Sequence, residues 1–137
     1  MTKKYFSFLL LLSFAICFVS CNDDEDSVQD RIVGTWQLQS MQEDGQAVSI
    51  IGQDDLVQFQ SNSIFLRYNS SATSAVKRGG WSYTGGMLNI SLDLPAAYYV
   101  LNLNANELKI KRLDFATTGL VKTTEFVYNK VSDDLIP

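Results

Sequence analysis

Residues 81–92 read WSYTGGMLNISL, a stretch in which apolar and polar side chains alternate on both sides of Gly85-Gly86. Alternation with a period of two is typical of a strand with one buried face. A two-residue connection made of glycines suits the tight hairpin turns that need positive φ angles. The stretch therefore predicts a β-hairpin, with one strand over residues 77–84 and the next over residues 87–92.

Similar strand patterns occur along most of the chain, rich in β-branched and aromatic residues and bounded by turn residues. Six further strands are predicted over residues 33–42, 55–60, 63–69, 97–103, 107–113 and 122–130. No segment shows a convincing helical period. The chain is therefore expected to be all-β, with eight strands.

The connections between these strands alternate between short and long. Tight turns are predicted at 61–62, 85–86 and 104–106, and longer loops at 43–54, 70–76, 93–96 and 114–121. In an up-and-down meander alternate connections lie at the same end, so the tight turns close a base and the longer loops surround a mouth. Eight antiparallel strands lose their exposed edges by closing into a barrel. We therefore expect an eight-stranded antiparallel up-and-down β-barrel, and a flattened sandwich or β-roll remains compatible with the same hairpins.

The N-terminal segment has the layout of a signal peptide, because Lys3 and Lys4 precede an uncharged, mostly apolar run over residues 5–19. The run is shorter than the roughly 20 residues that a membrane-spanning helix needs. Phe18-Val19-Ser20-Cys21 resembles the lipobox of bacterial lipoproteins, in which the cysteine is acylated and becomes the mature N-terminus. The resemblance implies a signal peptide over residues 1–20, lipid attachment at Cys21 and a membrane anchor.

The sequence CNDDED at residues 21–26 places an acidic run directly after that cysteine. Adjacent like charges favour an extended, solvated chain, so residues 21–31 are predicted to be a flexible tether. The run also resembles the lipoprotein export signal of Bacteroidota, which implies an outer-membrane lipoprotein exposed at the cell surface. The barrel is then expected over residues 32–131, with a C-terminal tail over 132–137.

The composition of the chain argues against several classes of function. The sequence has no histidine, the commonest general base and metal ligand near neutral pH, so we expect no enzyme, metal site or cofactor. Its two cysteines are Cys17, in the signal peptide, and Cys21. The adjacent acids Asp54-Asp55 and Asp133-Asp134 are more typical of solvated surface than of a catalytic pair. Loss of Lys3 and Lys4 takes the formal charge from −4 to −6, which argues against nucleic acid as a partner.

Short motifs within residues 32–130 suggest a family. Gly34-Thr35-Trp36 is similar to the Gly-X-Trp motif that opens lipocalins. Together with RGGWSYTGGMLNI at 78–90 and YYVLNLNANELKI at 98–110, it resembles the lipocalin-like domain of many Bacteroidota lipoproteins. The resemblance implies a barrel that can enclose a ligand cavity, and a basic residue that packs on the lipocalin tryptophan. Lys130 either takes this position or ends its strand as a lysine in solvent. Gly34, Trp36 and Lys130 are thus expected at the structural base of the barrel.

The more apolar phase of each strand predicts the inward-facing side chains. They are Trp36, Leu38, Val57, Phe59, Ile64, Leu66, Tyr68, Trp81, Tyr83, Leu88, Ile90, Leu92, Tyr99, Leu101, Leu103, Leu108, Ile110, Phe126 and Tyr128. In the strand over 97–103, Tyr98 and Val100 form a rival phase. Barrels of this size are either filled by such side chains or hold one small ligand.

Two cations, Arg112 and Lys77, fall in the inward phase near the predicted mouth. They are expected to meet a carboxylate or phosphate head group, unless they extend to water instead. The other predicted ligand-binding residues are Val57, Tyr68, Leu92 and Tyr99. The function expected is a lipid-anchored barrel that binds a small hydrophobic or acidic amphipathic ligand. The alternative is a filled barrel that contacts an unidentified protein or glycan through Phe65, Tyr98 and residues 48–51.

Overall fold

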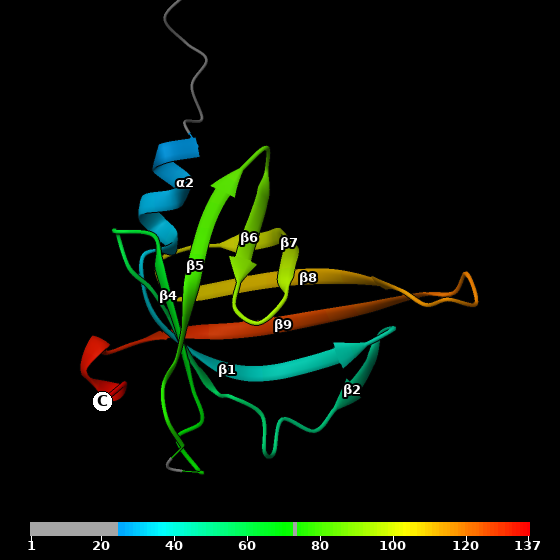
Figure 1. Ribbon diagram of the computed structural model, residues 1–137, viewed down its shortest axis with the longest axis horizontal. Helices are drawn as coiled ribbons and strands as arrows, with labels where there is room; N and C mark the ends of the chain where they lie inside the picture. Colours follow the sequence, from blue (N-terminus) through cyan, green and yellow to red (C-terminus); the bar gives the residue numbers. More distant parts are fainter. Residues whose placement is uncertain (1–24, 73) are drawn as a thin grey trace, which may run out of the picture.

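The computed structural model describes residues 25–72 and 74–137, which form one antiparallel sheet with a short helix before its first strand and another after its last (Figure 1). The elements in order are α2 (Glu25–Ile32), β1 (Gly34–Glu43), β2 (Gln46–Val48), β3 (Leu56–Phe59), β4 (Ile64–Tyr68), β5 (Lys77–Thr84), β6 (Met87–Ser91), β7 (Pro95–Leu103), β8 (Glu107–Phe115), β9 (Val121–Val131) and the 3₁₀ helix η2 (Asp133–Leu135).

The sheet closes on itself. Each strand from β3 to β8 pairs with the next, β3 pairs with the start of β1, and β9 pairs with β1 over most of its length. Strand β2 pairs with the far end of β1, at Met41–Glu43, and lies outside this circle. The predicted eight-stranded antiparallel barrel is therefore confirmed, with one additional short strand in the connection between β1 and β3.

The tight turns gather at one end of the barrel. Gly85 and Gly86 have φ angles of 60° and 77°, as the left-handed residues of a two-residue hairpin require. The turn between β3 and β4 holds three residues, 61–63, because Gln60 and Ile64 are the last hydrogen-bonded pair and Ser63 takes a φ of 66°. This turn is one residue longer than the sequence predicted.

That extra residue reverses the predicted orientation of β4. A two-residue turn would pair Phe59 with Ile64, whereas the structure pairs Phe59 with Phe65. Because alternate side chains face opposite sides of a sheet, a shift of one residue turns each side chain of the strand over. Phe65 is therefore buried, 5.1 Å from the ring of Phe59, and the predicted inward phase of Ile64, Leu66 and Tyr68 is wrong.

Strand β7 also faces opposite to the phase that was preferred from sequence. Tyr98 is 9% exposed, whereas Tyr99 and Leu101 are 44% and 43% exposed. The pairing with β8 shifts between Val100 and Asn102, as at a β-bulge. A bulge inserts one residue into the alternation, so Tyr98 and Leu103 can both face the core although their spacing is odd.

Helix α2 closes the base of the barrel beside the turn between β5 and β6 (Figure 1). Ile32 is fully buried, and its carbonyl oxygen accepts a hydrogen bond of 2.9 Å from the Trp36 indole. Val28, one turn earlier, packs against the same core. The prediction of a flexible tether is therefore wrong for residues 25–31, because Val28 and Ile32 give this segment an apolar stripe that the barrel buries.

The C-terminal residues also pack on the base. Thr35 is buried and its hydroxyl donates a hydrogen bond of 2.9 Å to the Asp133 carboxylate, at the start of η2. Ile136, which follows η2, is 9% exposed. Together α2 and η2 leave the opposite end, where the longer loops lie, as the open end of the barrel.

Candidate functional site

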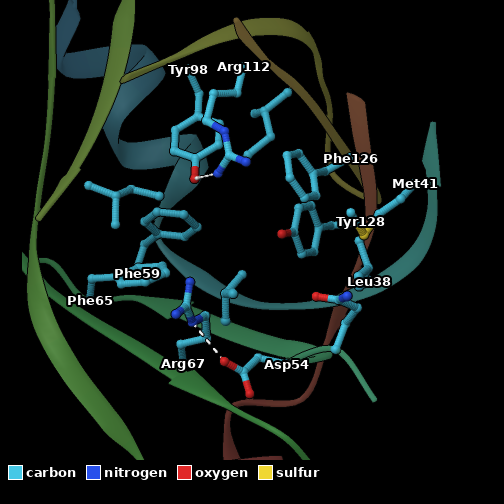
Figure 2. A pocket seen from close by; sticks show the side chains of 14 residues that line it. Leu38, Met41, Asp54, Phe59, Phe65, Arg67, Tyr98, Arg112, Phe126 and Tyr128 are labelled. Atoms are coloured by element: carbon cyan, nitrogen blue, oxygen red, sulfur yellow. Dashed lines mark hydrogen bonds and ion pairs between the residues drawn. The ribbon is translucent and has the colours of Figure 1, made fainter. Parts of the chain in front are cut away.

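A cavity of about 210 Å³ lies inside the barrel on the side of the mouth (Figure 2). Below it the base is filled by side chains such as Trp36, Leu88 and Leu108, which are fully buried. The apolar part of its wall is formed by Leu38, Met41, Val57, Phe59, Phe65, Ile90, Ile110 and Phe126. The polar part is formed by Gln53, Asp54, Arg67, Tyr98, Arg112 and Tyr128.

Arg112 reaches the cavity from β8 and is held on several sides. Its Nε lies 3.0 Å from an Asp114 carboxylate oxygen, and one terminal nitrogen donates to the Tyr98 hydroxyl at 3.4 Å. The guanidinium also lies 5.9 Å and 5.8 Å from the centroids of the Tyr98 and Phe126 rings. Burial lowers the pKa of Arg112, but Tyr98 and Asp114 outweigh burial and raise it overall. Arg112 is therefore a fixed, permanently charged group in the cavity wall.

Arg67 is the second cation in the wall and comes from β4. Its Nε lies 2.9 Å from the Asp54 carboxylate. The two groups form an ion pair, but the geometry of the N–H group is not that of a hydrogen bond. The same carboxylate oxygen of Asp54 accepts a hydrogen bond of 2.7 Å from Lys77. Asp54 is thus shared between a cation of the cavity wall and a cation at the rim.

The Tyr128 hydroxyl points into the cavity from β9 (Figure 2). Burial raises the pKa of Tyr128 strongly, and nearby Tyr98 raises it further. The charges of Arg67 and Arg112 act in the opposite direction and lower this pKa. Because burial dominates, the phenol stays neutral and can donate or accept a hydrogen bond.

The structure brings two of the predicted ligand-binding residues, Val57 and Arg112, into the cavity wall. Lys77 stands at the rim on Asp54, and Tyr68 contributes to neither the cavity nor the cleft beside it. Tyr99 lies on the outer surface, where Lys111 stands 5.7 Å from its ring. Tyr68 and Tyr99 do not reach the cavity because β4 and β7 face opposite to the phases predicted from the sequence.

Sequence reasoning missed Arg67, Tyr98 and Tyr128 as polar groups of one site. Arg67 follows Phe65 by two residues, so it faces inward only when the turn before β4 has three residues. The signal available was Ser61-Asn62-Ser63, since three-residue turns are among the next most common hairpin connections after two-residue turns. Tyr98 was recognised only as part of the rival phase of its strand.

A shallower cleft of about 500 Å³ adjoins the cavity. Leu92, which the sequence placed in the site, lines this cleft together with Leu94 and Pro95 of the connection between β6 and β7. The residues common to cleft and cavity are Arg67, Ile90, Tyr98 and Arg112. The two arginines therefore stand where the interior meets the outside.

Hydrogen bonds hold the loops of the mouth in place around Asp54. The neighbouring Asp55 accepts hydrogen bonds from the Ser70 amide at 2.8 Å and the Ser70 hydroxyl at 2.6 Å. Burial raises the pKa of Asp55, but these hydrogen bonds outweigh it and lower the pKa overall. Asn69 donates to the Gly52 carbonyl at 3.3 Å. These contacts join the connection before β3 to the connection after β4.

The three residues predicted at the structural base meet there, away from the cavity. Lys130 Nζ lies 4.5 Å from the centroid of the Trp36 ring and donates to the Val33 carbonyl at 2.6 Å. Burial lowers the pKa of Lys130, while Asp133 raises it. Gly34 has a φ of 135°, and a Cβ atom at this position would overlap the Lys130 side chain. This cluster joins the first strand to the last.

A family model for a lipocalin-like domain matches residues 32–110, more than half of the chain and most of the barrel. The chain belongs to the lipocalin-like domain family. Two solved structures share the fold of this lipocalin-like domain. A lipocalin-like protein from Bacteroides uniformis has a TM-score of 0.55 at 18% identity, over 74% of this chain and 99% of its own. A protein from Bacteroides eggerthii has a TM-score of 0.54 at 17% identity, over 73% and 99%. No curated protein matches the sequence significantly.

Other predictions for this lipocalin-like chain concern its N-terminus and its outer surface. Residues 1–20 and Cys21 are outside the described residues, so lipid attachment stays a prediction. Within residues 25–72 and 74–137, no helix is long and apolar enough to cross a membrane, and no group of three or more potential ligands could hold a metal ion. Phe65 and Tyr98 are buried, so the prediction that they form an outer interaction surface is wrong.

Proposed function

We propose that this chain is a membrane-anchored lipoprotein whose barrel binds one small hydrophobic or acidic amphipathic ligand. The observation that carries the proposal is the cavity of about 210 Å³, in which apolar walls surround two guanidinium groups. Binding sites for small molecules are typically apolar pockets with a few convergent polar groups. An eight-stranded barrel is just wide enough to hold one such ligand.

The volume of the cavity limits the size of the ligand. A cavity of about 150 Å³ in another protein holds benzene, whereas pockets for drug-sized ligands span about 300–1,000 Å³. At about 210 Å³ this cavity suits a single ring or a short aliphatic chain. A longer molecule would extend past Arg67 and Arg112 into the adjoining cleft.

We assign the barrel a binding role rather than a catalytic one. The sequence has no histidine, and the described residues of the cavity wall include no serine, threonine, cysteine or lysine. These four residue types are common nucleophiles of covalent catalysis, and each is activated by a neighbouring general base or by a lowered pKa. Asp54 is the one carboxylate among these wall residues, whereas glycosidase chemistry typically uses a pair.

Native mass spectrometry of the full chain, purified without denaturant, tests the binding proposal. We expect the protein to carry or take up a small molecule that is released on denaturation. Val57→Phe adds a ring to the cavity wall and should abolish this occupancy. Val127→Phe is the matched control, because Val127 lies on β9 outside the cavity wall and its variant should keep the ligand. Equal occupancy in the two variants would place the ligand elsewhere.

We also propose that Cys21 carries the lipid anchor and that the protein is an outer-membrane lipoprotein exposed at the cell surface. Residues 22–24 are all that separate Cys21 from helix α2, which lies at the base of the barrel. This arrangement would turn the mouth away from the membrane, so the ligand would enter from the aqueous side.

Radiolabelled palmitate tests the anchor in a bacterium that makes lipoproteins. Incorporation should be lost in Cys21→Ser and kept in Cys17→Ser, since Cys17 lies inside the predicted signal peptide. Protease treatment of intact cells then tests the location. Digestion of the barrel without cell lysis supports surface exposure, and protection until lysis would contradict it.

A further inference from the structure

The proposed ligand binding is the basis of a more specific inference about the ligand. We propose that the cavity selects a small monocarboxylate, whose carboxylate sits between Arg67 and Arg112 and displaces Asp54 from Arg67. The apolar part of the ligand would pack against Val57, Ile110 and Phe126. The chemical class is a single-ring or short-chain acid such as benzoate or hexanoate.

The balance of charge in the cavity wall favours one additional anion. The wall contains two guanidinium groups and one carboxylate, that of Asp54. Including the next contacts adds Lys77, which pairs with Asp54, and Asp114, which pairs with Arg112. In either count the positive charges outnumber the negative charges by one. Because the whole chain carries a formal charge of −4, this local surplus is opposite to the overall charge.

Both guanidinium groups keep unused hydrogen-bond donors. Arg67 contacts Asp54 through Nε, and within the described part of the chain its two terminal nitrogens make no hydrogen bond. Arg112 uses Nε on Asp114 and one terminal nitrogen on Tyr98, at the long distance of 3.4 Å. Figure 2 shows the two guanidinium groups on opposite sides of the same space. A planar carboxylate matches the forked donors of arginine.

The Tyr128 hydroxyl supports the same position for the anion. Tyr128, Arg67 and Arg112 all line the cavity, and Figure 2 shows the hydroxyl facing the space between the two guanidinium groups. A neutral phenol held there can donate a hydrogen bond to a carboxylate oxygen. The cation from β4 therefore faces a cation from β8 and a hydrogen-bond donor from β9, the strand that pairs with β8.

Asp54 pairs with Arg67 through its carboxylate, as the carboxylate of the ligand would. It lies in the connection before β3, and Lys77 already holds the same carboxylate oxygen at 2.7 Å. An incoming carboxylate can therefore take over Arg67 while Asp54 keeps one cationic partner. This exchange avoids leaving a buried charge without a partner, which would otherwise be costly.

Isothermal titration calorimetry of the full chain in lipid nanodiscs tests the inference, with empty nanodiscs as the blank. The probes are benzoate, phenyl phosphate and the neutral molecules benzamide and benzyl alcohol. A hydrogen-bonded charge contributes about 1.5–3 kcal/mol, so benzoate should bind at least about tenfold more tightly than benzamide. Phenyl phosphate, with nearly two charges, should bind more weakly than benzoate.

Substitutions show which residues are responsible for the preference for benzoate. Arg67→Met and Arg112→Met should each reduce the preference for benzoate by about tenfold, whereas Arg78→Met, on an exposed arginine of β5, should leave it unchanged. Asp54→Asn removes the competing carboxylate and should strengthen benzoate binding by about threefold or more. Asp30→Asn, on the exposed side of α2, is the charge-matched control. A gain of affinity cannot result from a damaged fold.

The outcomes separate this inference from the proposed function. If benzamide or benzyl alcohol binds as tightly as benzoate, the barrel binds small ligands but does not select a carboxylate. If no probe binds, the proposed function itself fails. A benzoate preference that persists in both arginine variants, tighter binding of phenyl phosphate, or no gain in Asp54→Asn would each overturn the arrangement proposed here.

Discussion

The ammonium group of Lys130 stands 4.5 Å from the centre of the Trp36 ring and donates a hydrogen bond of 2.6 Å to the Val33 carbonyl. One side chain of the last strand thus contacts the first strand and the residue that links it to α2. A cation over an indole contributes about 0.5–2 kcal/mol, and a charged hydrogen bond about 1.5–3 kcal/mol. The contact is therefore expected to stabilise the closed end of the barrel.

Lys130→Met should lower the free energy of unfolding by about 1–3 kcal/mol, measured by urea titration, because it removes both interactions. Lys111→Met is the control, since Lys111 stands over the exposed ring of Tyr99 at 5.7 Å. Its effect should stay below about 0.5 kcal/mol. Equal effects of the two substitutions would show that the position at the base has no special role.

Gly34→Ala should destabilise the barrel by about 1–3 kcal/mol, because φ is 135° there and the new Cβ atom would overlap Lys130. Gly45→Ala is the matched control, with a positive φ of 79° but open space around the site. The difference between the two variants reflects the overlap together with the less favourable φ of Gly34. Combining Gly34→Ala with Lys130→Met should cost less than the sum of the single changes, and strict additivity would contradict the overlap.

The lowered pKa of Asp55 predicts an acid-sensitive mouth. The folded pKa lies below the usual 3.8, so the hydrogen bonds to Ser70 stabilise the fold above that pH and are lost as the pH falls through the folded value. Asp55→Asn should therefore reduce stability near neutral pH, and the difference from wild type should shrink in acid. Urea titrations at about pH 7 and about pH 3 measure this difference in the free energy of unfolding. Asp93→Asn, at an exposed aspartate, is the control. A difference that does not depend on pH would contradict this assignment.

The raised pKa of Tyr128 predicts loss of stability in alkali. The unfolded phenol ionises near its usual pKa of 10.0, whereas the buried phenol stays protonated, so stability falls as the pH rises above about 10. Tyr128→Phe should lose less stability between about pH 8 and about pH 11 than wild type does. Tyr99→Phe, at an exposed tyrosine, should behave like wild type. Identical alkaline loss in Tyr128→Phe would show that another group is responsible.

The barrel was predictable because the hairpin at residues 81–92 and the alternating lengths of the connections are local features. The inward face of each strand depends on details that the alternation does not contain. Because the turn at 61–63 has one extra residue, Arg67 lies in the cavity wall, where the sequence had predicted Tyr68. A shift in the pairing between Val100 and Asn102 accompanied the change from Tyr99 to Tyr98. Arg112 and Val57 were identified because their strands keep the expected phase.

Helix α2 shows a different limit of sequence reasoning. The acidic residues at 23–26 dominate the local composition, and the pair Val28 and Ile32 is too short to define a helix by its period. An isolated helix of this length is unstable in water, and burial against the base of the barrel provides the missing stabilisation. The cavity was equally beyond the sequence, because its volume depends on how the wall residue Phe59 packs against Phe65 and Trp81.

A crystal structure of the protein grown with benzoate would test the central claim most directly. We predict electron density for the ring inside the barrel, with the carboxylate within hydrogen-bond distance of Arg112 and Arg67 and with Asp54 turned to Lys77. Density for benzoate only on the outer surface, or an interior closed by its own side chains, would contradict the assignment of this barrel as a binding site.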